Sequence, residues 1–150
     1  MLSLSVNTYF HLLFVIVIFC CLIMEIILVK EKMSYDEINK LSKIDGLYGF
    51  AAIVVVVTGL LNWMKFGKGV EYYNSNTFFI VKFSLFVLVG LLSLYPTILF
   101  LKTKRRLNKD QSAEMEFSAA PRVKKVIAIE LAIMTIIPLL AELMANGIDI

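Results

Sequence analysis

The chain has 150 residues, of which 59% are hydrophobic and 18% are charged, and its formal net charge at pH 7 is +3. Soluble domains average about 45–50% apolar and about 25% charged residues, and a chain this short cannot bury such an excess in one core. The composition therefore excludes a soluble enzyme, a disordered tail and a nucleic-acid-binding domain, and it predicts an integral membrane protein.

Four apolar runs are each long enough to cross a bilayer, which takes about 20 helical residues. They cover residues 9–29, 46–64, 78–101 and 126–145. Because backbone polar groups in lipid must be satisfied within their own segment, we expect helices even where valine-rich stretches favour strands. The prediction is an all-α integral membrane protein, with residues 1–150 forming a single domain, a bundle of four transmembrane helices.

The connections between these runs also carry local signals. Ser34 is followed three residues later by Glu37, which is the pattern of a helix-capping box. We therefore expect a short helix from about Tyr35 to Ser42 leading into the second span. The polar connection from Gln111 to Pro121 is expected to be a flexible loop.

The basic residues are distributed unevenly among the connections. Connections 30–45 and 102–125 contain four and eight of the 15 Lys and Arg residues, whereas the connection between the second and third spans contains two. Connections rich in Lys and Arg stay in the cytoplasm. We therefore predict that 30–45 and 102–125 are cytoplasmic loops and that both termini lie outside, the N-out/C-out arrangement.

The basic loops do not predict a nucleic-acid partner. Residues 102–109 hold five basic side chains in eight positions. Lys and Arg beside a span set topology and attract anionic lipid head groups, and no aromatic platform or recognition motif accompanies them. The partner that they indicate is the lipid bilayer.

Ionisable residues inside a span are costly, about 2.5–3.5 kcal/mol for Asp, Lys or Arg at the centre on insertion scales. This chain holds six within the spans or at their ends: His11, Glu25, Asp45, Lys82, Glu130 and Glu142. Their depths follow from a rise of about 1.5 Å per helical residue. The six fall into an outer and an inner layer.

The outer layer comprises His11, Lys82 and Glu142. One interpretation is a structural salt bridge between Lys82 and Glu142 that offsets the burial of both. Another is a binding site in which His11 and Lys82 hold an anionic or metal-containing ligand. A third is that the long side chains reach the nearby membrane surface.

The inner layer comprises Glu25, Asp45 and Glu130. His11 and Glu25 are 14 residues apart, close to four helical turns, so both should project from one face of the first span into the bundle. Either Glu25 and Glu130 pair with basic residues at the membrane boundary (Lys30, Arg122 or Lys125), or the layer is a proton-accepting cluster.

The single histidine limits the metal chemistry. A zinc site needs three or four converging ligands, and two bis-histidine haems would need four histidines. One haem b remains compatible with the sequence, with His11 as one axial ligand and Lys82, a methionine or a partner subunit as the other. We predict no metal site beyond haem iron at His11, and no hydrolase motif is present.

Several short segments together resemble a family of small bacterial predicted membrane proteins with four spans, a domain of unknown function. The segments are Asp45-x2-Tyr48-Gly49, Thr58-Gly59-Leu60, Phe66-Gly67-Lys68-Gly69, Asn76-x-Phe78-Phe79-x2-Lys82, Gly90-Leu91-Leu92-Ser93-x2-Pro96-Thr97, Glu130-Leu131 and Ile137-Pro138-Leu139. The resemblance covers nearly the whole chain. It implies the four-span architecture and a multi-pass protein of the bacterial inner (cytoplasmic) membrane, and it implies no particular chemistry.

More distantly, the chain is similar to HemJ-type protoporphyrinogen oxidase. In that family a His near the start of span one and a Lys early in span three are functional, and haem b is associated with the fold. His11 and Lys82, with Phe79 three residues earlier, fall at matching places. The chain differs at Glu25 and Lys30, where an Arg-bearing end of the first span is expected, and it lacks a His after span three. The resemblance implies that the outer layer can hold a porphyrin or a similar planar anion.

Three functions follow from these observations. The first is a non-enzymatic accessory or assembly subunit, working in a homo-oligomer or a larger membrane complex. The second is a haem- or porphyrin-binding, redox-associated protein, which would be an oxidoreductase if it is an enzyme. The third is a small proton-linked transporter that uses Glu25, Asp45 and Glu130.

Overall fold

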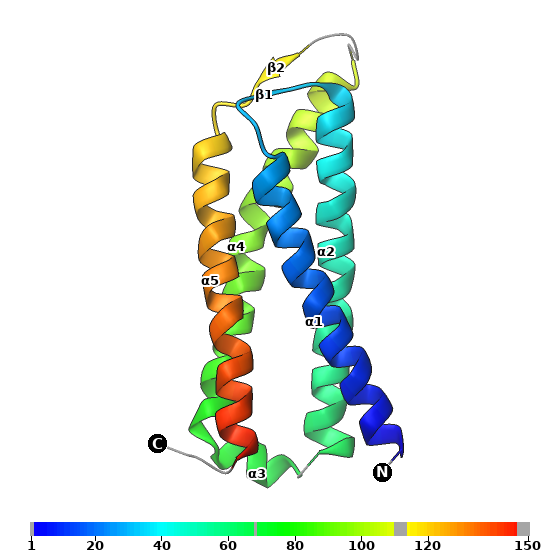
Figure 1. Ribbon diagram of the computed structural model, residues 1–150, viewed down its shortest axis with the longest axis vertical. Coiled ribbons are helices and arrows are strands. Elements are labelled where there is room, and N and C mark those ends of the chain that lie inside the picture. Colours follow the sequence, from blue (N-terminus) through cyan, green and yellow to red (C-terminus); the bar gives the residue numbers. More distant parts are fainter. Residues whose placement is uncertain (1, 68, 110–113, 147–150) are drawn as a thin grey trace.

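Four long helices run side by side along the molecule (Figure 1). The computed structural model describes residues 2–67, 69–109 and 114–146. The helices are α1 (Leu2–Leu28), α2 (Tyr35–Leu61), α4 (Thr77–Leu107) and α5 (Ala120–Ala145). All four are long and apolar enough to cross a membrane. The predicted all-α bundle of four membrane helices is confirmed.

The helices extend further than the predicted spans. α2 begins at Tyr35 and α4 continues to Leu107, because apolar runs mark only the part of a helix that lipid can cover. The predicted capping box is confirmed: the Ser34 hydroxyl accepts a bond from the Glu37 N–H at 3.4 Å, and Glu37 Oε2 accepts one from the Ser34 N–H at 3.0 Å. The expected helix from Tyr35 to Ser42 is thus the start of α2.

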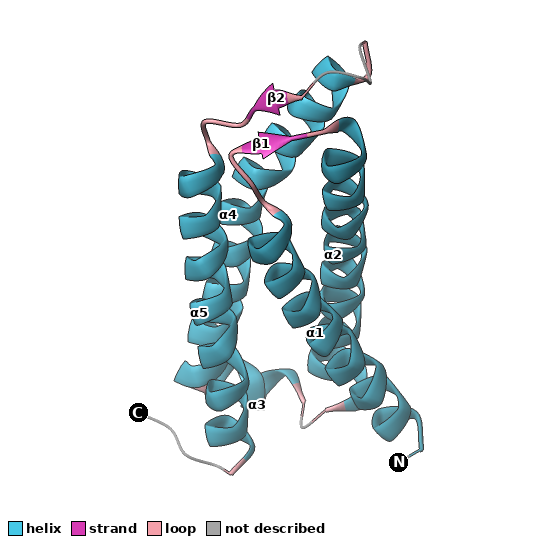
Figure 2. Cartoon of the chain, turned by 45° about the horizontal axis from the view of Figure 1, so that its top comes forward, coloured by secondary structure: helices cyan, strands magenta, loops and turns pink. Residues whose placement is uncertain are grey.

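Two short strands connect the helix pairs at one end of the bundle (Figure 2). β1 (Lys32–Met33) pairs antiparallel with β2 (Met115–Glu116). The Phe117 N–H also donates to the carbonyl oxygen of Glu31 at 2.6 Å. The expectation of a loop throughout this connection is wrong at Met115–Glu116, which form a strand because their backbone groups pair with the other connection. Positions 111–113 of that loop lie outside the described residues.

The opposite end is formed by the connection between α2 and α4. A π-helical turn, η1 (Asn62–Phe66), continues α2, and the short helix α3 (Val70–Ser75) follows it. A Cβ atom at Gly67 would overlap the carbonyl oxygen of Asn62 and the Tyr73 hydroxyl, so the close approach there requires glycine. The Tyr72 hydroxyl donates to the Met144 carbonyl at 2.9 Å. This bond ties the connection to the end of α5.

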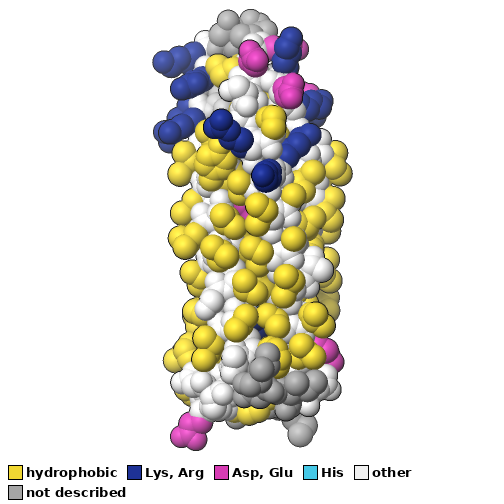
Figure 3. All heavy atoms as spheres, turned by 90° about the vertical axis from the view of Figure 1, so that its left-hand side faces the viewer, with side chains coloured by type: hydrophobic (Ala, Val, Ile, Leu, Met, Phe, Trp, Pro, Cys, Tyr) yellow, Lys and Arg dark blue, Asp and Glu magenta, His cyan; other side chains and the backbone are white. Residues whose placement is uncertain are grey.

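The outer surface is divided along the long axis. On the face shown in Figure 3, hydrophobic side chains cover the middle of the bundle, and Lys and Arg gather at the end that carries β1 and β2. We call this the basic end. α1 starts and α5 finishes at the other end (Figure 1), which we call the α3 end. An apolar belt with polar ends is the surface that a bilayer-spanning protein requires.

The interior of the bundle is apolar in its central part. One fully or nearly fully buried side chain from each helix meets there: Ile18, Val55, Val89 and Met134. This central apolar layer separates a cavity toward the α3 end from buried carboxyl groups toward the basic end.

Candidate functional site

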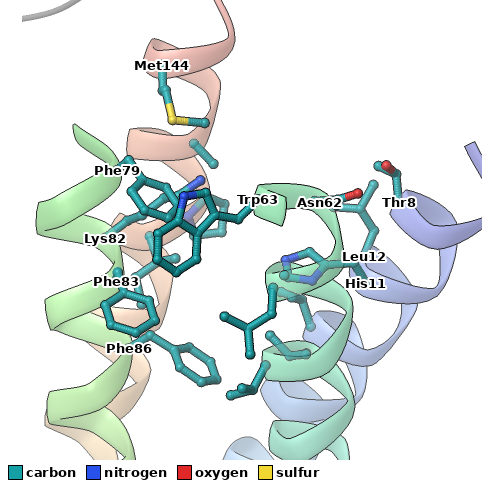
Figure 4. Close-up of a pocket in the computed structure, with 18 of the residues that line it drawn as sticks. Thr8, His11, Leu12, Asn62, Trp63, Phe79, Lys82, Phe83, Phe86 and Met144 are labelled. Carbon is teal, nitrogen blue, oxygen red and sulfur yellow. The ribbon is translucent and has the colours of Figure 1, made fainter. Parts of the chain in front are cut away.

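A cavity of about 320 Å³ lies between the helices toward the α3 end. Residues from α1, α2, η1, α3, α4 and α5 line it. Most of the wall is apolar or aromatic, and His11 and Lys82 line the same cavity (Figure 4). The structure therefore brings together two of the three residues that the sequence placed in the outer layer.

Lys82 is a half-buried cation on α4. Its Nζ atom lies 5.3 Å from the centroid of the Phe79 ring, within the range of a cation–π contact. Within residues 2–67, 69–109 and 114–146, no carboxylate forms an ion pair with it. A charge held in a membrane span without a counter-ion is costly. Lys82 is therefore a cation in the cavity wall that has no counter-ion in the described part of the chain.

Glu142 does not reach the cavity. It is exposed on α5, and its Oε1 accepts a bond from Asn146 Nδ2 at 3.0 Å. The α5 residues that line the cavity are Met134, Ile137, Pro138, Ala141 and Met144. Glu142 is not among them and leaves the helix about 100° from Ala141. The predicted Lys82–Glu142 salt bridge is wrong, because equal depth in the membrane did not mean a shared face.

His11 is fixed against α2. Its Nδ1 atom lies 2.9 Å from the Thr58 hydroxyl oxygen. That hydroxyl also lies 2.7 Å from the Val54 carbonyl oxygen, to which it donates its single hydrogen. Thr58 Oγ1 is then an acceptor, so we assign the hydrogen of the imidazole to Nδ1. Nε2 keeps its lone pair and can accept a hydrogen bond or bind a metal ion.

Gly59 makes room for the His11 ring. A Cβ atom at this position would lie 3.4 Å from His11 Cε1. A larger side chain would push the imidazole away from α2. Gly59 belongs to one of the segments that carry the family resemblance, and its spatial role could not be seen from the sequence.

Asn7 and Asn62 extend the hydrogen bonds around His11. Asn7 Nδ2 donates to the Thr58 carbonyl at 2.9 Å and to Asn62 Oδ1 at 2.8 Å. Sequence reasoning missed this network because uncharged polar residues near a span end are common. The four-residue spacings from Asn7 to His11 and from Thr58 to Asn62 would have placed each pair on one helix face.

Trp63 was also missed as a site residue. It extends from η1 toward Phe79 and Lys82 on α4 (Figure 4), and the Trp63 and Phe79 ring centroids are 5.4 Å apart. Its buried Nε1 has no hydrogen-bond partner in the part of the chain that the structure describes. The sequence indicated only an interfacial aromatic belt. The structure adds an unused N–H donor in the wall of the cavity.

The inner carboxyl groups also come together. Glu25 of α1, Asp45 of α2 and Glu130 of α5 are 2%, 7% and 1% exposed. The three carboxyl groups are close enough that their negative charges, if all were ionised, would repel one another. The Thr97 hydroxyl of α4 donates to Asp45 Oδ1 at 2.7 Å. We call Glu25, Asp45 and Glu130 the acid cluster.

The acid cluster has no basic partner among the described residues. Lys30 pairs instead with Glu37, at 2.7 Å, and Arg122 and Lys125 are exposed. The predicted pairing at the membrane boundary is therefore not observed. Oε1 of both Glu25 and Glu130 is buried without a hydrogen-bond partner in the described ranges. Over the same ranges, no group of three or more His, Cys, Asp or Glu side chains is arranged to hold a metal ion.

The family described as "Predicted membrane protein (DUF2214)" matches residues 4–149. No curated protein and no solved structure matches the chain.

Proposed function

The chain belongs to this family of predicted membrane proteins, and we propose that it binds an apolar organic anion in the cavity at the α3 end. The observation that carries the proposal is the Lys82 ammonium group, which faces an aromatic cavity and has no carboxylate partner in the described chain. A ligand with a carboxylate and an apolar body would complement both features.

The side chains around the cavity have distinct roles in this proposal. Lys82 pairs with the ligand carboxylate, and the unused Trp63 N–H can donate a second bond to it. Phe83 and Phe86 contact the apolar body. The cavity volume lies in the range of about 300–1,000 Å³ that is common for small-molecule pockets.

Haem b and free porphyrins belong to this ligand class, because they carry carboxylates on a flat apolar ring. The donor set is compatible with haem: His11 Nε2 would bind the iron, Lys82 would pair with a propionate, and Met134 and Met144 line the same cavity. Bound haem would supply one-electron chemistry, as in an oxidoreductase. The chain's own residues would hold the ring and shield it from water.

The proposal includes an orientation. The Lys and Arg side chains gather at the basic end (Figure 3), which supports placing that end in the cytoplasm of a bacterial inner membrane. The termini would then lie outside, and the cavity would open in the outer half of the bilayer. Three further predictions from the sequence are untested: that the protein is an accessory subunit, that it forms a homo-oligomer or joins a larger membrane complex, and that it transports a solute together with protons.

Intrinsic fluorescence can test the binding proposal, because Trp63 is the one tryptophan in the sequence and it lines the cavity. Protein in lipid nanodiscs is titrated with protoporphyrin IX and with its dimethyl ester, which lacks the carboxylates. We expect saturable quenching by the free acid and weaker binding of the ester. Lys82→Met should weaken binding of the acid roughly 10- to 100-fold, the size of a charge-assisted hydrogen bond of about 1.5–3 kcal/mol.

Lys65→Met provides the matched control. Lys65 lies near the same end of the bundle, is exposed and does not line this cavity. Its substitution should leave the affinity for the acid unchanged. Equal affinities for acid and ester in the wild type, or equal affinities of the wild type and Lys82→Met for the acid, would refute the proposal.

A further inference from the structure

We propose that the acid cluster, Glu25, Asp45 and Glu130, is a proton-binding site within the bundle, separate from the ligand cavity. Its ligand is the proton itself. Each glutamate takes up one proton from water, which converts one carboxylate into a neutral acid, and no electrons are transferred. The site rests on different residues from the proposed ligand cavity.

Every helix of the bundle contributes a group that faces the cluster. α1 provides Glu25 and the buried Cys21, and α5 provides Glu130. α2 provides Asp45 and Tyr48. α4 provides the hydroxyl of Thr97; between Phe83 and Leu101 its one ionisable side chain is Tyr95, which is 40% exposed on the outer surface. The facing groups therefore include three acids and no base.

The hydrogen bonds distinguish Asp45 from the two glutamates. Asp45 accepts a bond from Thr97, which is the partner that a carboxylate needs. Oε1 of Glu25 and Oε1 of Glu130 have no donor in the described residues, although both side chains are at least 98% buried, being 2% and 1% exposed. Two further negative charges here would be unpaired and would repel Asp45. Protonation removes both charges and gives each glutamate an O–H donor.

Apolar layers enclose the cluster on both sides. Toward the cavity lie Ile18, Val55, Val89 and Met134, and toward the basic end lie Leu41, Phe100 and Ile127, which are 0% exposed. His11 and Glu25 are 14 residues apart on α1, about 21 Å along the helix. A proton that moved from the cavity to the cluster would have to cross the central apolar layer. The two sites should function independently.

Infrared spectroscopy of the full chain in lipid membranes tests this inference. A neutral carboxylic acid has a carbonyl stretching band that a carboxylate lacks. We expect the wild type to show this band at neutral pH, to lose it at alkaline pH, and to shift it in D₂O. Glu25→Gln and Glu130→Gln should each reduce the band. Glu142→Gln, at an exposed site on the same helix as Glu130, should leave the pH-dependent band unchanged.

A second variant keeps the test informative if a Gln variant does not fold. Thr97→Val leaves all three acids in place and removes the donor to Asp45, so the neutral-acid band should increase. The inference is overturned if the wild type shows no such band at neutral pH, or if folded Glu25→Gln and Glu130→Gln proteins retain it in full. Protoporphyrin IX should quench Trp63 fluorescence in Glu25→Gln and in Glu130→Gln as it does in the wild type. A wrong proposal for the acid cluster and a wrong proposal for the ligand cavity therefore give different results.

Discussion

The Nδ1 atom of His11 and the hydroxyl oxygen of Thr58 lie 2.9 Å apart across the interface between α1 and α2. Because the Thr58 hydroxyl donates its own hydrogen to Val54, we assign the hydrogen of the imidazole to Nδ1. Nε2 is then the nitrogen that can serve a ligand.

Thr58→Val should loosen the His11 ring. The change keeps the side-chain shape and removes the acceptor of the Nδ1–H bond, so the free energy of unfolding should fall by about 1 kcal/mol. Nitrogen-15 NMR of labelled histidine should show one tautomer in the wild type and a mixture in the variant. Thr135→Val is the control, because Thr135 is exposed and bonds to Leu131 in its own helix. An unchanged tautomer in Thr58→Val would contradict the assignment.

Asn7→Ala should weaken the packing of the start of α1 against the end of α2. The side chain donates two hydrogen bonds, to the Thr58 carbonyl and to Asn62. Hydrogen bonds between membrane helices average about 0.6 kcal/mol each, so we expect a loss of about 1 kcal/mol in unfolding by sodium dodecyl sulfate. Asn74→Ala, at an exposed position of α3, should cost less. Equal stability of the two variants would exclude a stabilising role for the Asn7 bonds.

Ala141→Phe should block ligand binding. Ala141 lines the cavity, and a benzyl group there would occupy the space that a ligand needs. We expect a loss of at least about tenfold in affinity for protoporphyrin IX, or about 1.4 kcal/mol. Ala128→Phe, on the exposed face of the same helix, is the matched control. Retained affinity in Ala141→Phe, with the fold intact by circular dichroism, would place the ligand elsewhere.

Cysteine labelling tests the orientation. In a chain that lacks Cys20 and Cys21, Asn74→Cys introduces one thiol on α3 and Glu116→Cys introduces one on β2, at opposite ends of the bundle. A membrane-impermeant maleimide should label Asn74→Cys in intact spheroplasts. It should label Glu116→Cys only after the membrane is permeabilised. The reverse labelling pattern would show that the α3 end, and not the basic end, lies in the cytoplasm.

Much of the architecture could be predicted from the sequence, because lipid leaves few choices for the backbone. Apolar length predicted four helices, and the rise per residue placed Glu25, Asp45 and Glu130 at one depth. The three are close together in the structure. The same reasoning failed for Glu142, because depth does not specify the direction in which a side chain leaves the helix.

Other features depend on contacts that have no strong signal in a single sequence. The pairing of β1 with β2 joins two connections that are far apart in the chain. Trp63 faces the cavity because η1 continues α2 as a π-helical turn, which no simple periodicity indicates. The roles of Asn7, Thr58 and Gly59 around His11 likewise depend on how α1 packs against α2.

Photoaffinity labelling tests the ligand cavity most directly, because it locates the bound molecule. Membranes that contain the protein are incubated with a palmitate analogue bearing a diazirine, irradiated and mapped by mass spectrometry. We predict that the label attaches to residues that line the cavity, such as Trp63 and Phe83, and that Lys82→Met abolishes this attachment. Labelling confined to outward-facing residues of the apolar belt, such as Ile53 and Leu91, and equal in Lys82→Met, would contradict a binding site in the cavity.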